Sequence, residues 1–520
     1  MRRKPARQNP GRVRNAVGAS IPAPVKGWDA SSSLQEMEAG YAIRLDNWFP
    51  EPDRCRLRRG NKEHADGIGT GNVESLMQWH GPSSRKLFAA STDKIYDVSS
   101  SGAGVEVLGT LTNGRWQHVN FTTSGGHFLL AVNGADGLVS YNGTSFTTQT
   151  ITGITAADAV SICAHKKRVW LILKDSTKAA YLSVDSIAGA ATVFDLGSVF
   201  DKGGYLAAMG TWTVDSGTGP DDYAVFVSSA GQIAVYAGTD PASANTWGLQ
   251  GVFNLGQPLG RRFLTKVGGD LAVISIDGVL PLSKAIALDR GAVQIAAITQ
   301  QIQRAMNAAA VTGKDFFGWQ LVAYPKGTAA ILNVPTSDGL SAVQFVMNTL
   351  TGAWCRYTGQ NAFCWEVFGD RIFFGGADGK VFEADVTSKD DGQPIISDLK
   401  TGFNYFGSKG TKKHYKMIRP ALKSDGGVTP AITMNTDFLD DEPVTTISGA
   451  LTGQPKWNEV KWNEFQWAGG TVNQLDWYTV GRTGHCAAAR MKVAIQPADD
   501  FPVTLELTGF DVILEKGEFV

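Results

Sequence analysis

Sequence patterns that would support catalysis are scarce in this chain of 520 residues. There is no His-Glu-x-x-His metalloprotease pattern and no Gly-x-Ser-x-Gly nucleophile elbow. The nearest candidate for a phosphate-binding loop, residues 402–409, has Ser408 where the phosphate-contacting lysine should stand. On these grounds we expect a protein that is not an enzyme and that uses no cofactor.

Residues that commonly bind metal ions are present, but they are not spaced as ligands. The seven histidines show no zinc-ligand spacing, and the five cysteines never form a Cys-x-x-Cys pair. The scattered cysteines fit a reducing compartment better than a disulfide framework. Adjacent acids on loops are normally solvated, so a catalytic pair would have to converge from separate strands, for example in the channel of a propeller. The adjacent acids are Asp221-Asp222, Asp390-Asp391, Asp440-Asp441 and Asp499-Asp500.

Positive charge is concentrated at the N-terminus, although the formal net charge of the chain is only −1. Residues 1–26 hold seven basic residues and no acid, and their prolines prevent regular secondary structure. We expect an extended arm, which is either a solvated tail or a contact for phosphate groups or for an acidic partner surface. The candidate contact residues are Arg2, Arg3, Lys4, Arg7, Arg12 and Arg14.

From residue 70 to residue 386 the sequence alternates between short β-rich runs and turns. Similar hairpins recur, many of them with an Asp-Gly pair, because both central residues of a tight two-residue turn need positive φ angles. Their centres lie roughly 40 to 60 residues apart, which is the spacing of four-stranded propeller blades. We therefore predict an all-β chain whose main domain is a β-propeller of about six to seven blades. The expected hairpins are at residues 86–99, 127–141, 169–183, 222–238, 269–285, 344–357 and 370–385.

One segment interrupts the strands. Within residues 292–310, apolar residues recur at helical spacing, which predicts an amphipathic helix inserted between blades. Its apolar stripe either packs on the propeller rim or binds a partner. The stripe consists of Ile295, Ile298, Ile302, Met306 and Ala309.

The composition changes after residue 385. Residues 387–400 are interpreted as a polar linker, and later β-rich runs predict a C-terminal β-sandwich-like domain. Tryptophans recur every five residues at Trp457, Trp462 and Trp467, with Trp477 beyond them. In a strand, that odd spacing sends successive side chains to opposite faces, so the indoles either pack at the domain edge or form an edge that contacts sugar or protein. The expected strands are at residues 416–424, 431–438, 490–497 and 503–514.

Residues 42–60 carry a distinctive pattern, AIRLDNWFPEPDRCRLRRG. Its large apolar residues are expected to be buried as an anchor, which the prolines then end. Arginines alternate with apolar residues after the anchor, which predicts a strand with one basic face; they are Arg54, Arg56, Arg58 and Arg59. The anchor motif consists of Leu45, Asp46, Asn47, Trp48, Phe49 and Pro50.

This pattern resembles the opening motif of a family of tailed-phage virion proteins, the tail nozzle or tail-hub proteins of short-tailed phages. In that family an LDN-aromatic-aromatic-Pro signature and a basic strand precede a β-propeller. The similarity continues through the hairpins, the inserted helix and a C-terminal domain that ends in a strand and a Glu-Lys-Gly tail, here residues 514–520. Only residues 45–60 are specific to the family, because hairpin blades occur in many propellers.

The resemblance implies a structural role in the virion tail, assembled in the cytoplasm of a bacterial host. Such proteins form a homo-oligomeric ring, with a hexamer as one candidate size, below the portal and adaptor rings. They contact other tail proteins and, transiently, the genomic DNA that leaves through the channel they line. Two alternatives remain open: a receptor-binding tail-tip or fibre-type protein that recognises host glycan, and a propeller glycosidase or lyase.

The expected organisation follows from these observations. No apolar run is long enough to span a membrane, and no secretion signal is visible. The parts are an extended basic arm at 1–41, an anchor segment at 42–69, a β-propeller at 70–386, a linker at 387–400, and a C-terminal β-sandwich-like domain at 401–520.

Overall fold

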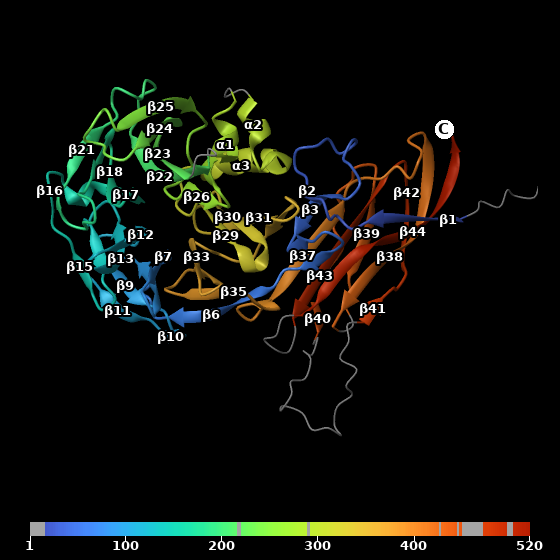
Figure 1. Ribbon diagram of the computed structural model, residues 1–520. Coiled ribbons are helices and arrows are strands. Elements are labelled where there is room, and N and C mark those ends of the chain that lie inside the picture. Colours follow the sequence, from blue (N-terminus) through green and yellow to red (C-terminus); the bar gives the residue numbers. More distant parts are fainter. Residues whose placement is uncertain are drawn as a thin grey trace, which may run out of the picture. The chain divides into compact units, whose positions relative to one another are not determined.

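The chain divides into two compact units, and each is described by itself. The terminal unit consists of residues 1–57, 396–499 and 503–520, and the propeller unit consists of residues 58–395 and 500–502. The two ends of the sequence therefore share one unit, and the expected anchor segment at 42–69 is divided between the two. The computed structural model (Figure 1) describes residues 16–215, 220–288, 292–425, 428–444, 447–449, 472–496 and 503–519.

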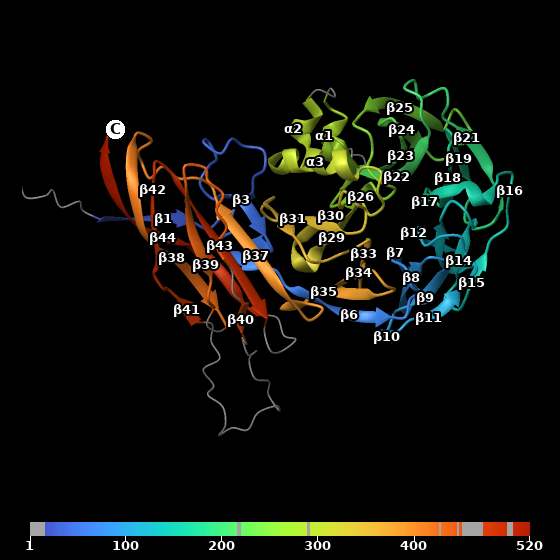
Figure 2. The same cartoon turned by 180° about the vertical axis from the view of Figure 1, so that it is seen from behind.

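The propeller unit is all-β in character, and its short antiparallel sheets follow one another around a centre, as in a propeller (Figures 1 and 2). Among the described residues, five sheets of three or four strands stand separately, besides a two-stranded pair of β16 (Ile151–Thr152) and β20 (Gly189–Ala190). The first is β7 (Val73–His80), β8 (Arg85–Ser91), β9 (Lys94–Asp97) and β11 (Val105–Leu108); the second is β12 (Gln117–Thr123), β13 (Gly126–Val132), β14 (Val139–Tyr141) and β15 (Phe146–Thr148). The third is β17 (Ala159–His165), β18 (Arg168–Leu173), β19 (Lys178–Tyr181) and β21 (Thr192–Asp195); the fourth is β22 (Leu206–Asp215), β23 (Pro220–Ser228), β24 (Gln232–Gly238) and β25 (Trp247–Asn254); the fifth is β26 (Leu264–Val267), β27 (Asp270–Ser275) and β28 (Gly278–Pro281).

Two further antiparallel groups continue this series. One is β29 (Gln320–Tyr324), β30 (Ala329–Pro335), β31 (Ala342–Asn348) and β32 (Trp354–Tyr357). The other is β33 (Cys364–Phe368), β34 (Arg371–Gly375) and β35 (Val381–Thr387), completed by β6 (Gly60–Asp66) from the start of the unit. The first strand of the unit thus pairs with one of its last, which closes the series.

All seven predicted hairpins are present as paired strands. Asp378 and Gly379 both have positive φ angles, 54° and 64°, but they do not form a two-residue turn, because Gly375 pairs with Val381 and residues 376–380 all lie in the loop. The expectation of a two-residue Asp-Gly turn is also wrong at Asp277-Gly278, because Ser275 pairs with Gly278 and the turn residues are Ile276 and Asp277. Gly278, with φ at 112°, instead begins the returning strand.

The helix predicted over residues 292–310 is broken into pieces. They are α2 (Val293–Ala296), η3 (Gln300–Ile302) and α3 (Gln303–Gly313), which follow α1 (Leu282–Ala285). The backbone is extended at Ala297, so the predicted apolar stripe is not continuous. Ile302 and Met306 are buried, whereas Ile295 is 69% exposed.

The terminal unit consists of two groups of paired strands. One sheet has the order β4-β5-β44-β38-β41, with β1 added on β44 and β42 added on β38; in the other group β3, β37, β43 and β39 pair in turn, with β2 on β3 and β40 on β43. Four of these strands match the strands expected within 401–520. The bounds are β1 (Ala16–Pro22), β2 (Gly27–Trp28), β3 (Tyr41–Asp46), β4 (Trp48–Pro50), β5 (Cys55–Leu57), β37 (Gln393–Thr401), β38 (Thr411–Ser424), β39 (Ala431–Thr436), β40 (Ile447–Gly449), β41 (Val472–Gln474), β42 (Tyr478–Gly484), β43 (Ala487–Gln496) and β44 (Leu505–Phe519).

Two predicted segments differ from the structure. The expected linker at 387–400 is largely strand, with β36 (Lys389–Asp390) turning into β37. Part of the expected arm at 1–41 is also ordered, because β1 pairs with β44 along its full length. The remaining short elements are β10 (Gly102–Ala103), η1 (Ala156–Asp158) and η4 (Pro325–Gly327). Among the described residues, every helix is too short or too polar to cross a lipid bilayer.

Candidate functional site

The anchor motif forms a compact strand–turn–strand element in the terminal unit. Strand β3 ends at Asp46, and Asn47 takes a left-handed conformation with φ at 62°. The Asn47 side-chain amide donates a 2.7 Å hydrogen bond to the carbonyl of Ile396. Asparagine tolerates this conformation better than most residues, so it allows the sharp turn from β3 into β4.

The apolar residues of the motif are buried, as the sequence predicts. Leu45 and Trp48 are 0% exposed and Phe49 is 1% exposed. The guanidinium of Arg56 lies 4.7 Å from the centre of the Phe49 ring. Strand β4 pairs with β5, and β5 pairs with β44, so the motif is part of the main sheet of this unit.

The predicted basic face is wrong beyond Leu57. Arg54 and Arg56 each donate to Glu51, at 2.9 and 2.7 Å, so their charges are partly neutralised. Arg58 belongs to the propeller unit, where its side chain is 1% exposed and forms two hydrogen bonds with Asp390. Alternation along a strand could not reveal this, because the partner is distant in the sequence. Asp390, one of the adjacent acids that were expected to be solvated, is therefore held in a buried ion pair with Arg58.

The arm residues proposed as partner contacts, Arg2 to Arg14, lie outside the described residues. So do Trp457, Trp462 and Trp467. Trp477 is described and is 37% exposed, with the Arg419 guanidinium 4.8 Å from its ring centre. Because the guanidinium covers one face of the Trp477 indole, that face is not free to stack on a sugar.

A cluster of charges that the sequence analysis missed lies inside the terminal unit. Arg490 on β43 is 0% exposed and binds Asp398 with two hydrogen bonds, of 3.0 and 2.7 Å. It also donates to Asp440 at 3.1 Å and to Glu442 at 2.7 Å. The cluster ties the loop after β39 to strands β37 and β43. The other cations that contact these acids are Arg44, Lys400 and Lys492.

The electrostatics of this cluster favour the charged forms. Hydrogen bonds from Lys492 and Arg490 lower the pKa of Glu442 to about 2. Burial opposes the charged form of Arg490, but the hydrogen bonds that it donates to Asp398 and Glu442 outweigh this effect, so its pKa is raised. The sequence shows that Asp440 and Asp441 are adjacent acids. It does not show that the buried Arg490 contacts Asp440.

A second group of polar side chains lines the centre of the propeller unit. Glu366 on β33 accepts a 2.9 Å hydrogen bond from the Gln78 amide on β7. The ring nitrogen Nε2 of His118 on β12 lies 3.7 Å from the other carboxylate oxygen of Glu366. Burial raises the pKa of Glu366 to about 8 and lowers the pKa of His118 to about 4. At neutral pH this pair is therefore mostly an uncharged acid beside an uncharged imidazole.

Arg262 spans the centre of the propeller unit from the segment before β26. Its Nη2 donates to the carbonyl of Glu74 at 2.9 Å, to the hydroxyl of Ser75 at 2.7 Å and to the carbonyl of Trp116 at 3.1 Å. These acceptors belong to the first two sheets, so one side chain links three parts of the ring.

The central group provides one carboxyl group, Glu366, whose raised pKa favours its protonated form. The retaining and inverting mechanisms both need a second, ionised carboxylate. Glu74 is the nearby acid, and it is held by Arg115 at 2.9 Å. Among the described residues, no group of three or more His, Cys, Asp or Glu side chains is placed to bind a metal ion.

Glu366→Gln should change how the stability of the protein depends on pH. The pKa of Glu366 is about 8 in the folded protein, against an ordinary value of 4.5. The folded state thus keeps a proton that the unfolded chain releases, so the stability contributed by Glu366 falls as pH rises from 4.5 to 8. His118 acts in the opposite direction, but only between its folded value of about 4 and its ordinary value of 6.5.

Above pH 6.5 the contribution of His118 to stability no longer changes with pH, so a change in stability between pH 6.5 and 8 reports on Glu366. Urea unfolding of both proteins across pH 6.5 to 8 should show that the wild type loses more stability than Glu366→Gln does. Parallel curves for the two proteins would contradict the assigned role of Glu366.

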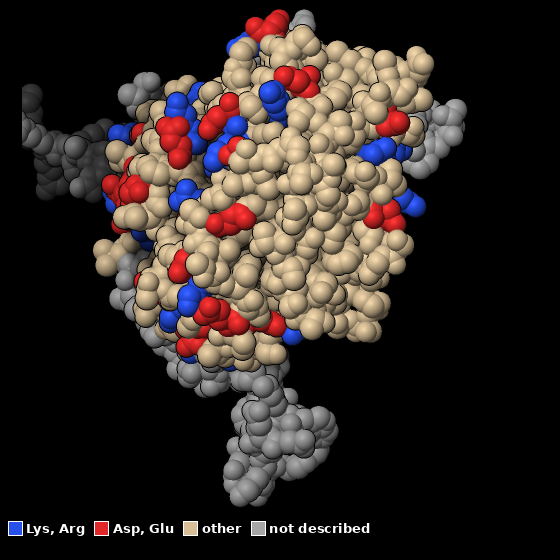
Figure 3. All heavy atoms as spheres, turned by 90° about the vertical axis from the view of Figure 1, so that its left-hand side faces the viewer, with Lys and Arg blue, Asp and Glu red and all other residues tan. Residues whose placement is uncertain are grey.

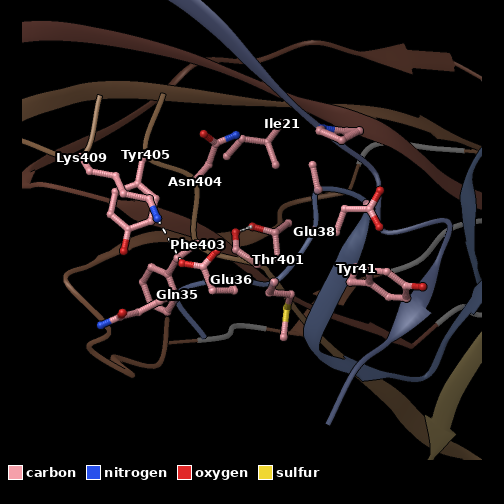
Figure 4. A pocket seen from close by; sticks show the side chains of 15 residues that line it. Ile21, Gln35, Glu36, Glu38, Tyr41, Thr401, Phe403, Asn404, Tyr405 and Lys409 are labelled. Atoms are coloured by element: carbon pink, nitrogen blue, oxygen red, sulfur yellow. Dashed lines mark hydrogen bonds and ion pairs between the residues drawn. The ribbon is translucent and has the colours of Figure 1, made fainter. Parts of the chain in front are cut away.

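A cavity of about 300 Å³ lies in the terminal unit beside the start of β3. Figure 4 shows Tyr41, Phe403 and Tyr405 around it, with Lys409 and Glu36 joined across one side by a 3.1 Å contact. Lys409 also lies 5.1 Å from the centre of the Tyr405 ring. Because Glu36 is paired and the Tyr405 ring is covered, the cavity presents little free binding chemistry.

Two stretches of the propeller unit carry no charged residue. Residues 137–157 and 241–260 contain no Asp, Glu, Lys or Arg. Figure 3 shows one face of the molecule, on which a tan area without charged side chains lies beside groups of Lys, Arg, Asp and Glu.

Comparison with known proteins shows a similarity of fold and nothing further. No family model and no curated protein matches the chain. Among solved structures, the β-propeller domain of Cps50 (Swd1) from Myceliophteria thermophila is 10% identical over 64% of this chain and 100% of its own, with a TM-score of 0.37. BBS1N in complex with ARL6DN is 10% identical over 63% of this chain and 98% of its own, with a TM-score of 0.38. The computationally designed Ika8 protein is 11% identical over 62% of this chain and 100% of its own, with a TM-score of 0.34.

The strand pairing defines the class of protein. The chain is an all-β protein with a propeller-like unit and a second β-rich unit built from both ends of its sequence.

Proposed function

We propose that this protein is a structural component of a short phage tail, a nozzle or hub subunit. Copies would form a homo-oligomeric ring, with six as the first size to test, below the portal and adaptor rings. The ring would surround the channel through which genomic DNA leaves the virion, after assembly in the host cytoplasm. In this role the chain is neither an enzyme nor a cofactor-binding protein.

The observation that carries the proposal is the structural role of the anchor motif, the most specific part of the resemblance to the tail nozzle family. Leu45, Trp48 and Phe49 are core residues of the terminal unit. The motif continues through β5 onto β44, the same strand that pairs with β1. The basic arm thus leads directly into a sheet that the motif helps to hold together.

The finer features of the fold belong to this proposal. We count the five separate sheets and the two further four-stranded groups as seven propeller blades, closed by β6. We interpret the two strand groups of the terminal unit as a sandwich-like domain. A propeller with a separate β-rich domain suits a rigid ring subunit, because antiparallel sheets carry loops and edges on which neighbouring copies can pack.

The basic arm is the proposed electrostatic contact. Its six candidate residues are part of a chain whose formal net charge is only −1, so any attraction to DNA or to an acidic surface must be local. We favour docking on an acidic surface of the portal or adaptor ring. A tube that must release DNA quickly gains little from binding it tightly.

Removal of residues 2–14 should prevent the protein from joining the portal-proximal ring. This deletion removes all six candidate residues but leaves β1 in its sheet, whereas a longer deletion would also disturb the fold. Incorporation is measured by mass spectrometry of purified particles and by binding to isolated portal and adaptor rings. A matched control replaces the five arginines of the arm with lysine, which keeps the charge and should keep incorporation.

The outcomes separate the two parts of the proposal. If the arm meets DNA instead of protein, the deletion should flatten the salt dependence of DNA binding. Normal incorporation together with unchanged salt dependence would reduce the arm to a solvated tail. Absence of the full-length protein from purified tails would overturn the tail function itself.

A further inference from the structure

The main sheet of the terminal unit has two open edges of different character. At one side is β1, and at the other is β42; among the described residues, each pairs with a single strand. Unpaired backbone groups on an edge strand are a template for pairing with another chain, so proteins usually protect such edges with charges, prolines or bulges.

The β42 edge is protected. The pairing register with β38 shifts between Tyr415 and Met417, which leaves an extra residue on β42. Gly481 has φ at 55° within that irregularity. A charged residue also stands on the strand, Arg482, which is paired with Asp441 at 3.0 Å. A bulge and a charge both oppose the addition of another strand.

The β1 edge has none of these features along its first six residues. Its sequence is AVGASIP, without a charged residue, and its only proline is the last residue. All seven residues pair with β44 in an unbroken register, from Ala16 with Glu515 to Pro22 with Gly509. A side chain built at Gly18 would meet nothing within 4 Å, so the space beside this position is open.

The sheet holds β1 in a fixed position for such a contact. The Ser20 hydroxyl donates a 2.8 Å hydrogen bond to Asp511 on β44, and Arg419 on β38 donates to the same carboxylate. Ile21 is 4% exposed and fixes the end of the strand, whereas Val17 is 43% exposed. The strand is thus ordered on one side and available on the other.

We infer that β1 is an interface for a second copy of this chain, through antiparallel pairing of β1 with its own counterpart about a two-fold axis near Ala19. An uncharged strand with an unbroken register is complementary to itself in this arrangement, and two-fold symmetric contacts are the commonest in homo-oligomers. The contact adds a strand to the sheet without requiring any change in the fold.

The arms that precede β1 do not oppose this contact. In an antiparallel pair they leave from opposite ends of the two strands. Seven residues at about 3.4 Å each separate those ends by roughly 24 Å. Because the screening length at physiological ionic strength is about 8 Å, repulsion between the arms is largely screened.

The inference does not depend on the tail function. A strand pair of this length buries less area than a standard interface, so we expect a weak, reversible dimer that is separate from any ring contact. Particle incorporation tests the tail function and cross-linking tests the strand contact, so either proposal can fail alone.

The test is disulfide cross-linking of the full chain carrying Ala19→Cys. Residue 19 should face its counterpart across the axis, so mild oxidation should give a covalent dimer. The matched control is Val105→Cys, which lies on an outer strand of the propeller unit and is 64% exposed. Four of the five native cysteines are buried, so their background reaction should be low.

A second variant checks that the edge itself is responsible. Val17→Lys combined with Ala19→Cys places a lysine on each edge strand, opposite Ile21 of the other copy, and should reduce the dimer yield about tenfold, with an unchanged melting temperature. Removal of residues 2–14 in the Ala19→Cys chain should leave the dimer yield intact. Equal yields from Ala19→Cys and Val105→Cys, or a dimer that Val17→Lys does not weaken, would overturn the inference.

Discussion

Arg490→Met is expected to lower the free energy of unfolding of the terminal unit by about 3–5 kcal/mol, because it breaks a buried ion pair from one side. Arg490 is 0% exposed, and its partner Asp398 is 6% exposed. Without the guanidinium, the carboxylate keeps the 3.2 Å contact with Arg44 but loses both bonds to Arg490. The loop that carries Asp440 and Glu442 loses its central anchor at the same time.

The measurement must report on this unit alone, since a chain with two units need not unfold in one step. Hydrogen exchange of the amides of β43 and β37 provides that local readout, with urea unfolding as the global one. Lys492→Met is the matched control, because Lys492 lies 2.7 Å from the exposed Glu442 but 3.7 Å from the buried Asp398, so it should cost less than Arg490→Met does.

A double variant separates charge from packing. Arg490→Met combined with Asp398→Leu removes both charges, and replacing a buried pair by apolar residues is often close to neutral. We therefore expect it to recover much of the lost stability. If Arg490→Met alone unfolds like the wild type, the cluster contributes no stability and the assignment is wrong.

The parts of the fold that sequence could predict are those with local signals. Hairpins at residues 86–99 and 370–385 carry their turn residues beside their apolar runs, and both are present. The anchor motif was also recognisable, because Trp48 and Phe49 stand together between polar residues and both are buried.

The features that sequence could not predict depend on partners far apart in the chain. Arg58 appeared to belong to a basic face, yet it is bound to Asp390, 332 positions away. Asp440 appeared to be a solvated loop acid, yet Arg490 approaches it from 50 positions away. The same reason hid the pairing of β6 with β35 and the inclusion of both chain ends in one unit. Periodicity shows which face of a strand is polar, but not which distant charge will neutralise it.

Trp48→Ala and Phe49→Ala should each lower the free energy of unfolding of the terminal unit by about 3–5 kcal/mol. Both side chains are essentially buried, so each substitution removes apolar contacts and leaves a cavity. Phe49→Ala also removes the ring that faces the Arg56 guanidinium at 4.7 Å. Hydrogen exchange of the β4, β5 and β44 amides, together with urea unfolding, measures the loss.

Two control variants decide whether these residues anchor the fold or face a partner. Phe49→Leu keeps most of the apolar volume and should cost less than Phe49→Ala does. Trp477→Ala removes an indole of the same unit that is 37% exposed, so it should cost far less than Trp48→Ala. If both alanine variants at the anchor melt like the wild type but fail to enter particles, the two aromatic residues contact a partner instead. Loss of stability with the predicted order of severity would instead mean that the motif acts through the sheet it supports, because β1 and β5 both pair with β44 in that sheet.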